Sequence, residues 1–156
     1  LLVLNVPFLF GWAKPVPVNV RNLKKYALYL ALIALAGPIA NLAMAILWAL
    51  IIKAMQHGLY ASLPPYIGVW LLETSQRGIY INCLLAIFNM LPIPPLDGSK
   101  VLNALLPYSW RWINDALEQY GLMVVILLMI AGVLSTPIFY ANAFLIYGIS
   151  VITGLV

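Results

Sequence analysis

The run Asn89-Met90-Leu91-Pro92-Ile93-Pro94-Pro95-Leu96-Asp97-Gly98 ends a long apolar segment with three prolines and one carboxylate. Proline lacks a backbone donor and interrupts a helix, and a charged aspartate at the bilayer centre costs about 2.5 to 3.5 kcal/mol on insertion scales. Irregular backbone at membrane depth persists only where it is buried in protein or lines a wet cavity. The run therefore predicts a helix that ends near Asn89 and restarts near Asp97, with a functional site at the break.

The composition around this run is that of an integral membrane protein. Apolar residues make up 65% of the 156 residues and charged residues 8%, whereas roughly a quarter of the residues in a soluble domain are charged. We therefore predict an all-α fold, a polytopic bundle of transmembrane helices in which the lipid bilayer is the solvent. Nucleic acid is not an expected partner. The single cysteine, Cys83, rules out an intrachain disulfide.

Hydropathy predicts one membrane-embedded domain with five segments. The first long apolar run has the length to cross a hydrocarbon core of about 30 Å at 1.5 Å per residue. Basic residues precede it, as they do on cytoplasmic flanks. The predicted segments are a surface or extended segment at about 1–25, a span at 26–52, an interfacial segment plus broken span at 66–106, an interfacial helix at 108–120, and the C-terminal span or spans at 121–156.

Two features of this division stay open. Ser135-Thr136-Pro137 interrupts the last apolar stretch, which is either one kinked span or two passes. The chain also begins Leu1-Leu2-Val3-Leu4, without an initiator methionine and already within an apolar stretch. We interpret this start as truncation at the N-terminus.

Three pieces of the sequence, taken in order, resemble one family. Phe10 to Asn19 (FGWAKPVPVN), Gly37 to Asn41 (GPIAN) and the run from Asn89 to Gly98 are similar to the region that follows the zinc-binding helix in site-2 protease-like intramembrane metalloproteases, peptidase family M50. The resemblance covers most of the chain and implies that it is the C-terminal part of such an enzyme. The last run is the most specific of the three pieces.

The resemblance implies a function and a set of site residues. The enzyme would be a zinc metalloendopeptidase of regulated intramembrane proteolysis, which hydrolyses a peptide bond in or near a transmembrane segment of a protein substrate, in the cell membrane of a prokaryote. Asp97, in Leu96-Asp97-Gly98, would be a Zn²⁺ ligand, and a hydrolytic zinc site of three protein ligands keeps a position for water. The residues expected to contact an extended substrate segment or support the site are Asn89, Pro92, Pro94, Pro95 and Asn41.

The sequence departs from this family in one respect. The family's other two zinc ligands and its general base belong to a His-Glu-x-x-His helix, and this motif is absent from the 156 residues. We therefore place no catalytic residue in this chain, expect the general base upstream, and expect the chain alone to be inactive. His57 is the single histidine, and we predict it in a loop on the face opposite the site.

Alternative interpretations remain for the residues and for the whole chain. Asp97 could be a helix N-cap, and Asn41 could form a hydrogen bond that only holds the bundle together. The chain could be a non-catalytic membrane scaffold, which the upstream gene sequence would distinguish from an enzyme. It could also be a fragment of a transporter or channel, but the sequence has no second copy of the proline-aspartate-glycine break, as an inverted repeat would supply.

Overall fold

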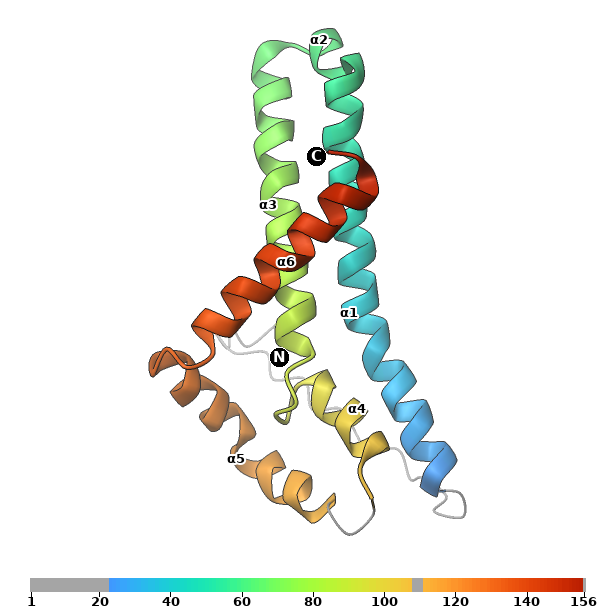
Figure 1. The fold of residues 1–156 in the computed structure, drawn as a ribbon, viewed down its shortest axis with the longest axis vertical. Helices are drawn as coiled ribbons and strands as arrows, with labels where there is room; N and C mark the ends of the chain where they lie inside the picture. Colours follow the sequence, from blue (N-terminus) through green and yellow to red (C-terminus); the bar gives the residue numbers. More distant parts are fainter. Residues whose placement is uncertain (1–22, 108–110, 156) are drawn as a thin grey trace, which may run out of the picture.

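The fold is built on a long antiparallel pair of helices to which three further helices attach (Figure 1). The computed structural model describes residues 23–107 and 111–155. All regular elements in this part of the chain are helical, in agreement with the predicted all-α class. They are α1 (Leu23–Ala54), η3 (Met55–Leu59), α2 (Tyr60–Ser62), α3 (Pro65–Asn89), α4 (Asp97–Leu105), α5 (Arg111–Ile130) and α6 (Ser135–Thr153).

Helix α1 packs against both α3 and α4 through a stripe of small residues. Its buried positions recur at spacings of three, four or seven residues, which places them on one face of the helix. Small side chains let neighbouring helices approach closely, and this is how membrane helices gain contact without a hydrophobic driving force. The helix continues through Pro38 without interruption. The buried small residues are Ala31, Ala34, Pro38, Ala45 and Ala49.

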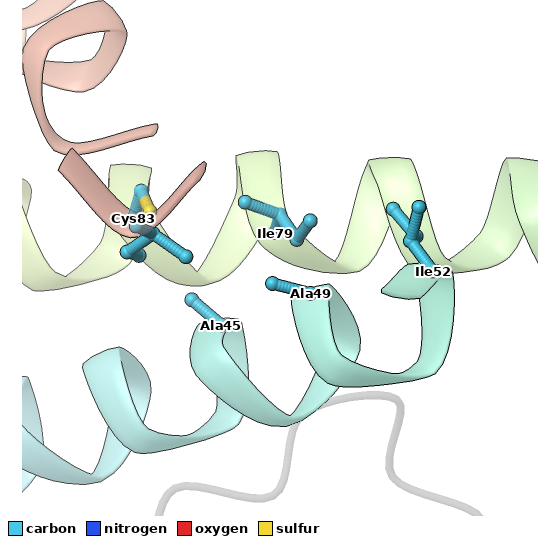
Figure 2. Close-up of a cluster of buried hydrophobic side chains, with 6 residues drawn as sticks. Ala45, Ala49, Ile52, Ile79 and Cys83 are labelled. Carbon is cyan, nitrogen blue, oxygen red and sulfur yellow. The ribbon is translucent and has the colours of Figure 1, made fainter. Parts of the chain in front are cut away.

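The core lies between α1 and α3. Figure 2 shows Ala45, Ala49 and Ile52 of α1 facing Ile79 and Cys83 of α3. Ile149 of α6 completes this buried cluster, which joins three helices. Cys83 is fully buried in it and serves as a small packing residue.

The turn between α1 and α3 carries the single histidine. Gly58 takes a positive φ of 111°, a conformation that glycine adopts without a steric penalty. The exposed His57 side chain lies next to the Lys53 carbonyl oxygen, and the distance from His57 Nδ1 to that oxygen is 2.9 Å. This turn is at the end of the α1–α3 pair far from α4 (Figure 1).

The helix bounds in the second half of the chain can be compared with the predicted segments. Helix α3 is continuous from Pro65 to Asn89. Residues 111–120 are the beginning of α5 and not an independent surface helix. Residues 1–22, which hold most of the predicted extended segment, and residues 108–110 lie outside the described part.

The last apolar stretch forms two helices, α5 and α6. The break lies at 131–134, just before the predicted Ser135-Thr136-Pro137 interruption. Pro137 falls in the first turn of α6, where the missing proline donor costs no helical hydrogen bond. Gly132, with φ 74°, turns the chain between the two helices.

Two helical stretches among the described residues are long and apolar enough to cross a bilayer. They are Leu28–Ser62, which contains most of α1, and Ser135–Thr153, which is α6. A shorter apolar helix covers Tyr120–Ile130 in α5. Helix α3 has 25 residues but also carries Glu73, Arg77 and several amides.

Candidate metal centre

The predicted helix break is present at the predicted residues. Helix α3 ends at Asn89 and α4 begins at Asp97. Local hydrogen bonds hold the ends of the intervening loop: the Leu91 N–H donates to Phe88 O at 3.1 Å, and the Leu96 N–H donates to Ile93 O at 3.0 Å. The loop therefore carries its own turns between the two helices.

Two glycines let neighbouring helices press against this loop. A Cβ on the buried Gly98 would overlap the carbonyl of Met90, so the first turn of α4 lies directly against the end of α3. A Cβ on Gly121 would overlap the carbonyl of Pro94, so α5 touches the loop from another side. Because the obstacles are backbone atoms, neither position has room for a side chain.

The loop prolines differ in their surroundings. Pro94 is buried beside α5, whereas Pro92 and Pro95 are exposed. Asn89, the last residue of α3, is half-buried. The exposed prolines present a surface of the loop that has no backbone donor.

Asp97 is the first helical residue of α4, and Leu96 holds the N-cap position without a side-chain capping bond. The N-cap interpretation of Asp97 is therefore wrong, because the carboxylate does not cap the helix. The side chain is 28% exposed, and Oδ1 accepts a hydrogen bond from Lys100 Nζ at 2.8 Å. A carboxylate in the first turn also interacts favourably with the helix dipole.

The second carboxylate oxygen of Asp97 faces α1. Oδ2 lies 3.4 Å from the position that a Cβ would take on Gly37. Gly37 has no side chain and is exposed, so it leaves space beside Oδ2. Asn41 follows Gly37 by four residues and so occupies the same face of α1. Its side chain is half-buried and makes no hydrogen bond within residues 23–107 and 111–155.

The arrangement supplies one good zinc donor but not a complete zinc site. A carboxylate oxygen is an accepted zinc ligand, and protein zinc sites use three or four such donors. Within the described part of the chain, no group of three or more histidine, cysteine, aspartate or glutamate side chains could hold a metal ion. The turn that carries His57 and the helix α4, which begins at Asp97, lie at opposite ends of the α1–α3 pair (Figure 1).

Several contacts of this centre were not predicted from the sequence. Lys100 follows Asp97 by three residues, and this helical spacing could have indicated the ion pair. Gly37 belongs to the predicted GPIAN piece, but its contact with Asp97 joins residues far apart in the chain. The contact of Gly121 with Pro94 has no local sequence signal.

Comparisons with known proteins give one consistent result. Residues 67–132 match the profile of Peptidase family M50. The chain is 35% identical over 78% of its length to "Putative zinc metalloprotease YwhC" of Bacillus subtilis (strain 168), of which the match covers 55%. It is 40% identical over 60% of its length to "Putative zinc metalloprotease MJ0611" of Methanocaldococcus jannaschii, of which the match covers 43%.

A third relative is more distant. The chain is 29% identical over 67% of its length to "Putative zinc metalloprotease Rip2" of Mycolicibacterium smegmatis, of which the match covers 38%. The chain thus spans about half the length of the curated relatives that it matches. No solved structure matches it significantly.

Proposed function

Because the chain belongs to peptidase family M50, we propose that it forms part of a zinc-dependent endopeptidase that hydrolyses a peptide bond in or near a transmembrane segment of another protein, in the cell membrane of a prokaryote. The observation that carries the proposal is the position of Asp97. Its carboxylate lies at a helix break, with one oxygen on Lys100 and the other 3.4 Å from the position that a Cβ would take on Gly37.

The proposed role of Asp97 is to hold Zn²⁺ through Oδ2. Lys100 occupies Oδ1 and orients the carboxylate, as outer partners of metal ligands commonly do. Gly37 keeps the space beside Oδ2 clear. The described residues do not supply a set of three such ligands, so the site also needs donors from elsewhere in the intact protein.

A bound zinc ion supplies Lewis-acid activation of water for attack on a peptide carbonyl. The chain's own residues would then position the substrate. The loop between α3 and α4 places irregular backbone next to Asp97, and the exposed Pro92 and Pro95 keep that stretch non-helical. We assign to this loop the contact with an unwound substrate strand, and to Asn41 and Asn89 hydrogen bonding beside it.

The proposal is tested by comparing Asp97→Asn with Glu73→Gln in the intact protein. Asp97→Asn keeps the side-chain shape but removes the charge that attracts a cation, so zinc content and cleavage of a membrane-embedded reporter should both fall by tenfold or more, as an order-of-magnitude estimate. Glu73→Gln is a matched control, because that carboxylate is 60% exposed and, among the described residues, pairs with Arg77 on its own helix.

Zinc is measured by atomic spectroscopy and folding by circular dichroism in the same preparation. Full zinc content and full cleavage in Asp97→Asn would show that the carboxylate is not a ligand. If the unmodified intact protein binds no zinc and cleaves no reporter, the scaffold interpretation replaces the enzyme.

A further inference from the structure

The two carboxylate oxygens of Asp97 have different neighbours. Lys100 Nζ donates a hydrogen bond to Oδ1 at 2.8 Å. Oδ2 lies 3.4 Å from the position that a Cβ would take on Gly37, an exposed residue of α1. One oxygen therefore faces a cation and the other faces a residue without a side chain, so the two differ in how they can accept a metal ion.

The contact with Lys100 is local to α4. Lys100 follows Asp97 by three residues, and this spacing places both side chains on one face of the helix. The two side chains are 50% and 28% exposed, and ion pairs as exposed as this one contribute little to stability. The consequence of the contact therefore lies in the properties of the carboxylate and not in the stability of the fold.

A carboxylate can bind a metal ion through one oxygen or through both. An ion that binds both oxygens of Asp97 lies beside Oδ1 and hence close to the Lys100 ammonium group. An ion on Oδ2 alone lies farther from that group, and the repulsion between like charges falls with distance. Lys100 thus disfavours the arrangement in which both oxygens bind.

The number of bound oxygens matters for hydrolysis at zinc. A catalytic zinc site with three protein ligands keeps its fourth position for water. A second oxygen from the same carboxylate would add a donor and crowd the position of that water. An ion such as Mn²⁺, which prefers six oxygen ligands, would instead gain from the second oxygen.

Resting on the zinc role proposed above for Asp97, we propose that Lys100 is a positioning residue that confines the metal ion to Oδ2. Asp97 is then a ligand through one oxygen, and the site favours a four-coordinate ion such as Zn²⁺ over Mn²⁺. Gly37 complements Lys100 by leaving the side of Oδ2 without a side chain.

The first test uses the intact protein loaded with Co²⁺ in place of Zn²⁺. Four-coordinate Co²⁺ absorbs visible light more strongly than Co²⁺ with five or six ligands, so the spectrum reports how many donors bind. Lys100→Met frees Oδ1 and should lower the absorbance per bound Co²⁺ severalfold. Lys100→Arg keeps a cationic donor three residues after Asp97 and should restore the absorbance.

The second test is competition between Mn²⁺ and Zn²⁺ for the same preparations. Lys100→Met should reduce the preference for Zn²⁺ about tenfold, which is the lower end of the effect of losing an outer partner of a metal ligand. Arg77→Met is the matched control, because it removes the cation of another ion pair within one helix, that with Glu73 on α3. Its spectrum and its preference should equal those of the unmodified protein.

The outcomes separate this proposal from the zinc role of Asp97. If Asp97→Asn loses the metal ion but Lys100→Met keeps the unmodified spectrum and preference, only the role of Lys100 is overturned. A loss of absorbance in Lys100→Arg equal to that in Lys100→Met would also overturn it, because the cationic donor would then not be the cause. Absence of bound metal from the unmodified intact protein would overturn both proposals.

Discussion

At the scale of single residues, the candidate centre depends on what stands on either side of one carboxylate. Lys100 approaches Oδ1 of Asp97 from its own helix, and Gly37 approaches Oδ2 from α1. The Lys100 ion pair is half-exposed, so its contribution to stability is small, about 0 to 1 kcal/mol. The more informative neighbour is Gly37, because it determines whether Oδ2 can accept a ligand.

We predict that Gly37→Val lowers zinc retention about tenfold while the protein stays folded. The added methyl groups would occupy the space beside Oδ2, where a Cβ already lies in van der Waals contact. Gly148→Val is the control, because a Cβ at Gly148 meets nothing within 4 Å and the change in helix propensity is the same. Zinc titration of both variants checks the prediction, and equal affinities would count against a metal at Oδ2.

At the scale of elements, the loop between α3 and α4 is held by close backbone contacts. Gly98 brings α4 against the Met90 carbonyl, and Gly121 brings α5 against the Pro94 carbonyl. Backbone cannot move away as a flexible side chain can, so a methyl group at either glycine displaces a whole helix. These contacts fix the direction of α4 relative to the loop, and therefore the orientation of Asp97, the first residue of α4.

We therefore expect Gly98→Ala to destabilise the protein by about 1 to 3 kcal/mol through overpacking. Gly148→Ala should instead stabilise it by about 0.5 to 1 kcal/mol, because alanine is the better helix former and the space there is open. Unfolding in mixed micelles measures both variants. Similar changes of unfolding free energy in the two variants would mean that α4 packs more loosely against the Met90 carbonyl than the geometry indicates.

At the scale of the whole molecule, a hydrogen bond between Lys53 and Thr153 joins the two candidate spans. Lys53 near the end of α1 donates through Nζ to the carbonyl oxygen of Thr153 at 2.6 Å, across 100 residues of chain. That carbonyl belongs to the last turn of α6, where a cation also interacts favourably with the helix dipole. The bond anchors the C-terminal end of α6 at the end of the fold far from Asp97.

Lys53→Met should cost about 1.5 to 3 kcal/mol of unfolding free energy, because it removes a partly buried hydrogen bond from a charged donor. Arg77→Met is the control: its ion pair with Glu73 is 3.5 Å long and the Arg77 side chain is 78% exposed, so the effect should stay within about 0.5 kcal/mol. If Lys53→Met lowered the unfolding free energy no more than Arg77→Met does, the Lys53–Thr153 hydrogen bond would not anchor α6.

The sequence by itself determined the helical class, the break between Asn89 and Asp97, and Asp97 as the acidic residue at that break. These follow from local properties, because prolines stop a helix wherever they occur in its interior and a long apolar run indicates a span without reference to its neighbours. The sequence also carried the family resemblance, since the motif residues stand in order along the chain.

Only the tertiary structure decided which faces of these helices meet. Helix α1 is apolar on all sides, so hydrophobic periodicity could not indicate that Gly37 faces Asp97. The contact of Gly121 with Pro94 likewise depends on how helices cross. In a membrane protein the lipid and the interior are equally apolar, and helix rotation is therefore set by packing between helices and not by the pattern of hydrophobic residues.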